Sequence, residues 1–333
     1  MQKKLTVGIF VLLGIVLLAK GEAYTPQRIS VPLDESLIAW IKFNLSPATS
    51  LPLSFYIDPE KKSDVYARMG KADSVGDAIE RMIVEEGIVI YDAAVAQIAL
   101  AQTGRFEEMY FAQRPMEFYW KDSLGEMDHI RAGFPLHSFI YDPAHPEAVS
   151  SDPSAYGRRG FIFRILNAHG RYLSQDPLDG KTSMEDFPNW PSLHWEDWKP
   201  IAGENAWVAL AALHLYHQKY FNPQTQSYDH HPNAVELQLA EELARAAMLL
   251  QAHNGGIRMA PLGTYHEKAQ AQEAGQSDWW YTQISTENNL SWYAAFRMLF
   301  ELTGNEQYHR VLLGQEHFFK AVFNWEEGFF FRG

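Results

Sequence analysis

The chain has 333 residues, contains no cysteine and carries a formal net charge of −13 at pH 7. This length suits one large domain or two medium ones, with ample sequence for a hydrophobic core. The acidic balance argues against a nucleic-acid partner, because phosphate binding needs clustered Lys and Arg, and mildly against a polyanionic substrate. A sequence without cysteine excludes thiol catalysis, cysteine-ligated metals and disulfides.

The N-terminal segment has the layout of a signal peptide. Lys3 and Lys4 precede an apolar run from Leu5 to Ala19, and small residues follow up to Ala23. We therefore expect cleavage after residue 23, export to the periplasm or beyond, and a single mature domain over residues 24–333. The alternative is an uncleaved anchor, but the run is shorter than the roughly 20 residues that span a bilayer. After cleavage we expect no stable membrane insertion.

The first half of the mature chain mixes helical patterns with short apolar runs. The segment from Tyr91 to Gln102 is apolar on almost every side, which is typical of a buried helix. Around it we expect helices at Leu37–Phe43, Ser74–Glu86, Arg105–Gln113 and Phe161–Leu173, and short strands at Ile88–Tyr91 and Gly133–Tyr141.

The second half begins with a long irregular stretch, residues 176–200, and then becomes regularly helical. Helices apolar on nearly all sides alternate with amphipathic ones, a pattern that favours an inner and an outer layer. The expected helices are Gly203–Tyr220, Glu236–Ala252, Asn288–Leu302 and Gln307–Phe323. Turns at Thr103-Gly104 and Thr303-Gly304 occupy the same place in two such pairs.

An acidic residue stands near the start of each of the three most apolar helices: Asp92, Glu204 and Glu287. We take these as candidate catalytic residues, because glycosidic hydrolysis needs one carboxyl that donates a proton and a second that activates water. Each has a structural alternative. Asp92 suits an N-cap, Glu204 suits the helix dipole, and Glu287 could belong to a polar layer between helices.

The chain holds 10 Trp, 16 Tyr and 20 Phe, which either stack on sugar faces or pack in a helical core. Asn288 and Asn289 are poor helix formers within a strong helix, and binding of a ligand would explain them. The candidate substrate-binding residues are Tyr91, Trp195, Trp198, Asn205, Trp207, Trp279, Trp280, Tyr281, Asn288 and Asn289. Glu196 and Asp197 are further candidate acids. We expect no metal site and no cofactor.

Three motifs resemble those of the six-hairpin glycosidase-like superfamily: Tyr91-Asp92-Ala93-Ala94, Gly203-Glu204-Asn205-Ala206-Trp207 and Ser285-Thr286-Glu287-Asn288-Asn289-Leu290. The resemblance covers most of residues 50–333. It implies an all-α fold, an (α/α) toroid of inner and outer helices, and the activity of a glycoside hydrolase, polysaccharide lyase or sugar epimerase. The chain offers about nine to ten helices where a closed ring of six hairpins needs twelve, so we expect a toroid that is incomplete at its C-terminus.

The leading hypothesis is an exported, monomeric enzyme that hydrolyses glycosidic bonds of an oligo- or polysaccharide with paired carboxylates. The resemblance favours inversion of configuration. Two alternatives stay open: a polysaccharide lyase or sugar epimerase on the same scaffold, and a non-catalytic envelope protein that binds glycan.

Overall fold

The computed structural model describes residues 35–46, 50–64, 84–85, 87–123, 161–162, 164–167, 174–175, 182–183, 194–197, 201–260 and 279–331. Within these ranges the chain is mostly helical, with a few short strands. The predicted signal peptide lies outside them, as do the predicted strand Gly133–Tyr141 and all of the predicted helix Ser74–Glu86 except residues 84 and 85. Of the helices described, none is both long and apolar enough to cross a membrane.

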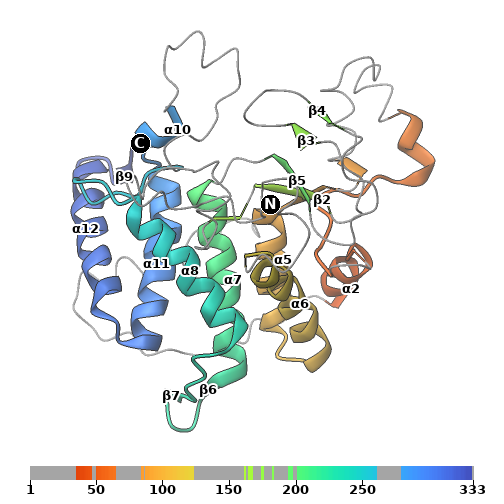
Figure 1. The fold of residues 1–333 in the computed structure, drawn as a ribbon, viewed down its shortest axis with the longest axis horizontal. Helices are drawn as coiled ribbons and strands as arrows, with labels where there is room; N and C mark the ends of the chain where they lie inside the picture. The colour runs from red at the N-terminus through yellow and green to blue at the C-terminus, as the bar shows by residue number, and fades with distance from the viewer. Residues whose placement is uncertain are drawn as a thin grey trace.

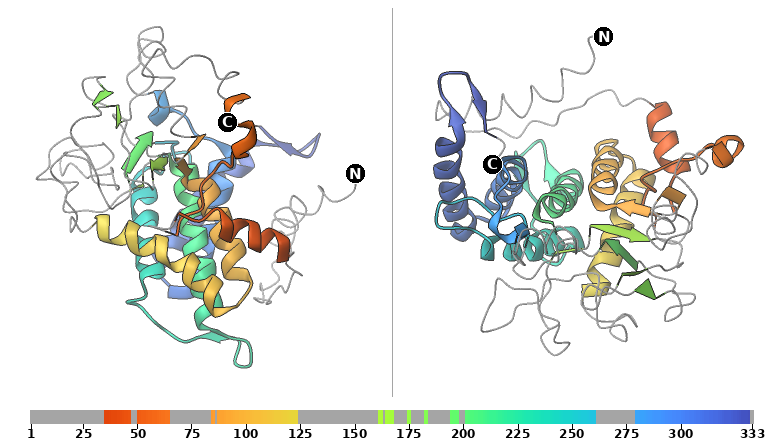
Figure 2. Two further views of the ribbon diagram at one scale, coloured as in Figure 1. Left: turned by 90° about the vertical axis from the view of Figure 1, so that its right-hand side faces the viewer. Right: turned by 90° about the horizontal axis from the view of Figure 1, so that it is seen from above.

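Six helices form three pairs: α5 (Ile90–Gln102) with α6 (Phe106–Ser123), α7 (Ala202–Tyr220) with α8 (Val235–Leu249), and α11 (Thr286–Thr303) with α12 (Glu306–Val322). Helices α5, α7 and α11 lie side by side and run the same way, with their N-termini at the upper side of Figure 1. Their partners α6, α8 and α12 run back along the outside of this row (Figures 1 and 2).

Helix α7 is the centre of the core. It packs against α5 and α11 in the row and against α6 and α8 outside it. Twelve of its 19 residues are buried, which agrees with its apolar sequence on all sides. The expectation of an inner helix buried on nearly all sides is therefore confirmed for α7, whereas α11 buries six of its 18 residues and α8, on the outside, eight of its 15.

The two Thr-Gly turns predicted from the sequence end the inner helices α5 and α11. Gly104 and Gly304 both have a φ of +64°, a left-handed conformation that glycine adopts without a steric penalty. The Gly304 N–H donates to the Phe300 carbonyl at 2.8 Å, and Asn305 then begins α12 by accepting the Gln307 N–H at 3.0 Å. The same sequence signal therefore produces the same reversal twice.

Short strands lie beside the helices. β1 (Gly87–Val89), β2 (Ile165–Asn167) and β5 (His194–Asp197) form an antiparallel sheet in the order β1-β2-β5, and β3 (Ser174–Gln175) pairs with β4 (Thr182–Ser183). The predicted strand Ile88–Tyr91 is confirmed in part as β1. The predicted helix Phe161–Leu173 is wrong, since β2 lies within it. A short apolar run does not distinguish strand from helix, and pairing with β1 and β5 decides in favour of a strand.

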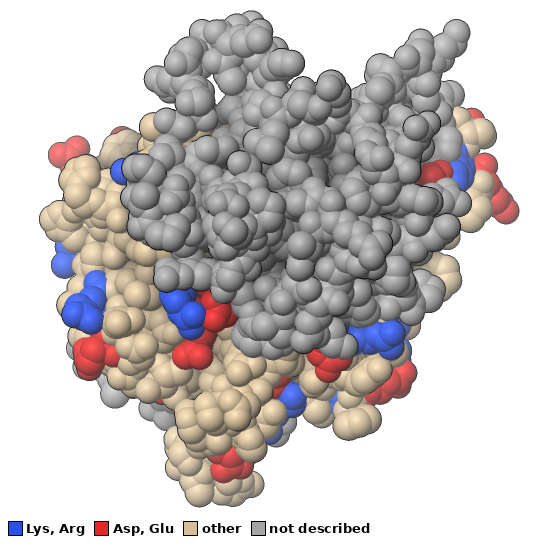
Figure 3. Space-filling view, in the orientation of Figure 1, with Lys and Arg blue, Asp and Glu red and all other residues tan. Residues whose placement is uncertain are grey.

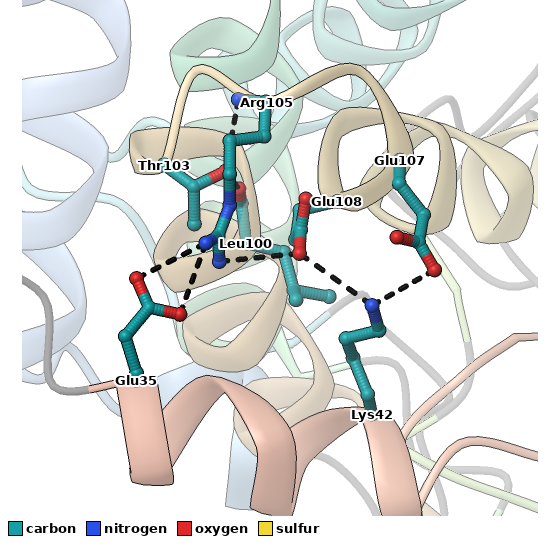
Figure 4. A network of polar contacts seen from close by, with 7 residues as sticks. All are labelled: Glu35, Lys42, Leu100, Thr103, Arg105, Glu107 and Glu108. Atoms are coloured by element: carbon teal, nitrogen blue, oxygen red, sulfur yellow. Dashed lines mark hydrogen bonds and ion pairs between the residues drawn. The ribbon is translucent and has the colours of Figure 1, made fainter.

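Helix α2 (Glu35–Phe43) is held against the turn between α5 and α6 by a charged network (Figure 4). Arg105 contacts both carboxylate oxygens of Glu35 at 2.9 and 3.0 Å, and also Glu108 at 3.1 Å. Lys42 contacts Glu107 at 2.8 Å and Glu108 at 3.5 Å. Because the Glu108 side chain is only 6% exposed, it is the buried member that joins both cations.

A one-turn 3₁₀ helix, Pro59–Lys61, follows further along the chain.

Candidate functional site

The N-termini of α5, α7 and α11 lie together on one side of the row of inner helices (Figure 1). Asp92 and Glu204 are each the third residue of their helix, and Glu287 is the second. The N-cap of α5 is Val89, whose side chain makes no cap bond, so the interpretation of Asp92 as an N-cap is wrong. Ser285 caps α11 by accepting the Asn288 N–H, so Glu287 is not needed for that purpose.

Tyr91 is the point at which two of these helix starts meet. Its ring packs edge-on against Trp207 of α7, with the ring centres 5.2 Å apart. Partial burial raises the pKa of the Tyr91 phenol above 10, and the negative charges of Glu287 and Asp92 raise it further. The charges of Asp92 of α5 and Glu287 of α11 therefore both act on this phenol, which stays protonated at neutral pH and can donate a hydrogen bond.

All three polar members of this group face solvent. Tyr91 is 37% exposed, and Asp92 and Glu287 are exposed as well. The second residue of the intervening helix α7 is Gly203, and the Asn288 amide of α11 packs over its α-carbon. We call Tyr91, Asp92, Trp207 and Glu287 the helix-start site. Its chemistry is two carboxylates, one phenol donor and an indole, drawn from all three inner helices.

Glu204 has a different environment. Its carboxylate lies 3.1 Å from the Arg164 guanidinium, and its side chain is 16% exposed. Arg164 precedes β2, and its carbonyl accepts the N–H of Ile90, the first residue of α5, at 3.1 Å. Glu204 therefore joins α7 to the segment that supports α5. Arg164 was not among the predicted site residues, and its only sequence signal is a cation within the apolar run Phe161–Leu166.

Asn205 and Asn289 make the same set of hydrogen bonds at the starts of α7 and α11. Asn205 Oδ1 accepts the Ile162 N–H at 2.7 Å, and its Nδ2 donates to the Ile162 and Ile201 carbonyls at 3.0 and 2.9 Å. Asn289 Oδ1 accepts the Ile257 N–H at 2.6 Å, and its Nδ2 donates to the Ile257 and Ser285 carbonyls at 2.9 and 2.8 Å. Both side chains are 0% exposed, so a structural role replaces the predicted contact with substrate.

The predicted aromatic residues have different environments. Trp207 belongs to the helix-start site, and Tyr281, in α10 (Trp279–Thr282), lies under the Arg258 guanidinium at 4.3 Å. Trp280 is partly buried. Trp195 lies in β5, as do the further candidates Glu196 and Asp197, and Trp279 begins α10. The described structure does not include the side chains of these four residues. Trp198 lies outside the described residues.

Trp292, which was not predicted as a site residue, is fully buried, and its Nε1 donates to the Ala202 carbonyl at 2.8 Å. It therefore fixes the start of α7 against α11. Asn288 packs directly over Gly203, and its Nδ2 has no hydrogen-bond partner within the described structure. These contacts set the distance between the two helix starts.

Within the described ranges, no group of three or more His, Asp or Glu side chains could hold a metal ion. On the face drawn in Figure 3, the described Lys and Arg side chains lie among Asp and Glu side chains. Comparison with protein-family models, with curated proteins and with solved structures found no match.

Proposed function

We propose that the protein is an exported carbohydrate-active enzyme that hydrolyses glycosidic bonds at the helix-start site, with Asp92 and Glu287 as the carboxyl pair. One observation carries the proposal: both carboxylates act on the Tyr91 phenol, although Asp92 and Glu287 are far apart in the sequence. Hydrolysis needs two carboxyls on either side of the scissile bond, and the electrostatic effect of both residues on one phenol supports this pairing.

The other members of the site fit the same substrate class. The Tyr91 phenol is a hydrogen-bond donor for a sugar oxygen, and the Trp207 ring beside it offers an apolar face. A net charge of −13 favours a neutral glycan over a uronate polymer. The three α/α pairs suit the inner and outer layers of the six-hairpin glycosidase-like toroid, and the lysine-led apolar run before residue 23 supports export. We propose that the protein acts as a monomer.

Glu204 does not belong to the proposed pair, because Arg164 already occupies its carboxylate. A lyase or epimerase with Tyr91 as the base is disfavoured, because a phenol with a raised pKa holds its proton at neutral pH. The second candidate function is glycan binding without chemistry. It is favoured by the exposure of both Asp92 and Glu287, since a general acid is usually placed in apolar surroundings.

The test is digestion of a panel of neutral glycans, with release of reducing ends as the readout, by the wild type and by Asp92→Asn and Glu287→Gln. Each substitution should lower the rate about a hundredfold or more. The control is Glu301→Gln, a carboxylate at the other end of α11 that pairs with Arg297 at the surface. Hydrolysis that survives both site variants would rule out this pair. Binding of glycan by the wild type without hydrolysis would favour the second candidate.

A further inference from the structure

The hairpin of β8 (Phe323–Asn324) and β9 (Phe329–Phe330) presents large aromatic side chains to solvent. It follows α12 and stands out from the helical body (Figure 2). Trp325 is 73% exposed, Phe331 53% and Phe329 45%. Exposed apolar side chains that gather in one place can mark a binding surface.

A second hairpin in the same chain shows what this backbone requires. β6 (Phe221–Asn222) and β7 (Ser227–Tyr228) pair in the same register, and in both hairpins an aromatic pair closes the strands: Phe221 with Tyr228, and Phe323 with Phe330. Both pairs of rings are in contact, with centres 5.1 and 4.8 Å apart.

The turns are also built alike. The side chain of Asn222 accepts two backbone N–H groups of its turn at 3.0 and 3.4 Å, and that of Asn324 accepts two at 3.0 and 3.1 Å. The residue four positions further on is left-handed in each, with a φ of +54° at Gln226 and +75° at Gly328. The phenylalanine, the asparagine and the closing aromatic residue are therefore the framework of both hairpins.

The three exposed aromatic positions are not part of that framework. The residues that correspond to Trp325, Phe329 and Phe331 in the other hairpin are Pro223, Ser227 and Asp229, all exposed. The backbone forms equally well with them: the Asp229 N–H donates to the Tyr220 carbonyl at 2.9 Å, as the Phe331 N–H donates to the Val322 carbonyl at 2.8 Å. Folding of the hairpin therefore does not explain the aromatic side chains.

The two hairpins differ in where they lie in the fold. β6–β7 follows the C-terminus of α7, away from the helix starts (Figure 1). The β8–β9 hairpin is attached to the start of α11, because the Thr286 hydroxyl donates to the Phe331 carbonyl at 2.7 Å. Thr286 immediately precedes Glu287, so the C-terminal end of the hairpin, at Phe331, lies next to the start of α11.

We infer that Trp325, Phe329 and Phe331 form a second sugar-contact surface, for a neutral oligosaccharide whose other end occupies the helix-start site. This rests on the proposed function. The Trp325 indole packs at 78° to the Phe323 ring, with ring centres 4.8 Å apart, and at 73% exposure it offers apolar surface to a pyranose ring. Glu326 and Glu327, exposed in the same turn, offer acceptors for sugar hydroxyls. The substrate class is therefore a chain of several sugars rather than a mono- or disaccharide.

The test is calorimetric binding of cello-, malto-, xylo- and manno-oligosaccharides, from disaccharide to hexasaccharide, to the full chain. The variants are Trp325→Gln and Phe329→Ser, which introduce polar residue types of the kind found in the β6–β7 hairpin, and the control is Gln224→Ala in that hairpin. For each oligosaccharide series that the wild type binds, each variant should weaken the affinity for the hexasaccharide about tenfold and leave the affinity for the disaccharide unchanged. The control should change neither.

The possible results separate this inference from the proposed function. Length-dependent binding that the variants abolish supports the inference even where no glycan is hydrolysed. Equal affinity of wild type and variants for every length overturns the inference while hydrolysis stands. Absence of binding to all four oligosaccharide series also overturns the inference. A wild-type dimer that Trp325→Gln converts to a monomer in light scattering overturns it as well, because the rings would then contact a second copy of the chain.

Discussion

Asn288 of α11 lies against the α-carbon of Gly203 of α7, so closely that a β-carbon at position 203 would overlap its amide group. An alanine there should normally favour a helix by up to about 1 kcal/mol. At this site we expect Gly203→Ala to destabilise the protein by about 1 kcal/mol instead, because the Asn288 side chain must leave its place over α7. Urea unfolding measures the change.

Asn288→Ala removes the atoms that the new β-carbon would meet, so the double variant should recover most of the loss. A coupling free energy near zero between the two positions would contradict the close contact.

The buried amides of Asn205 and Asn289 should contribute more to stability than a helix cap. Asn289→Ala leaves the N–H and C=O of Ile257 without their partner, and we expect a loss of about 2–4 kcal/mol. Asn305 is the control, since its side chain caps α12 at an exposed position, and Asn305→Ala should cost about 1 kcal/mol. Equal losses for the two variants in denaturant unfolding would show that the buried contacts add nothing.

His214 should make stability depend on pH. Burial, and secondarily His217, lowers its pKa from 6.5 to about 4, while its Nδ1 lies 3.1 Å from Gln102 Nε2. The unfolded chain therefore gains a proton on this side chain as the pH falls through 6.5, and the folded protein does not until about pH 4. Stability is full above the unfolded pKa and is lost below it, by about 2 kcal/mol at about pH 5.

Urea midpoints at neutral and mildly acidic pH measure this loss, which should shrink in His214→Gln. The exposed His309 supplies the control. A His309→Gln variant that removes the same pH dependence would argue against His214 as its source.

Glu107 and Glu108 provide a matched pair of carboxylates on one lysine, because both contact Lys42. Glu107 is 63% exposed and Glu108 6%. We expect Glu107→Ala to change stability by at most about 0.5 kcal/mol and Glu108→Ala to lower it by about 3 kcal/mol, because Arg105 and Lys42 lose their shared buried partner. Limited proteolysis near α2 should follow the same order. Similar effects of the two variants would contradict the role assigned to burial.

Helix α7 could be predicted because its residues are apolar on nearly every side, and the two Thr-Gly turns because a left-handed backbone favours glycine. The segment Phe161–Leu173 was assigned to a helix because apolar spacing over a few residues is ambiguous. Its true partners, β1 and β5, are distant in the sequence, and only the folded chain brings them together.

Contacts between residues distant in the sequence also decide the roles of the side chains at the helix starts. The motifs around Asp92 and Glu287 correctly pointed to helix N-termini, but the role of the neighbouring amides depended on backbone 43 and 32 residues upstream. Arg164 was missed for the same reason, since a single cation in an apolar run does not reveal which carboxylate it will contact.

The amide contacts of Asn205 and Asn289 have a consequence for the order in which the chain can fold. In the folded chain the backbone groups of Ile162 are bound by Asn205 of α7, and those of Ile257 by Asn289 of α11. The segments that contain Ile162 and Ile257 therefore complete their hydrogen bonding only when α7 and α11 form, and we expect the row to gain stability as a cooperative unit. Amide hydrogen exchange at Ile162 and Ile257 would then report the opening of the whole row.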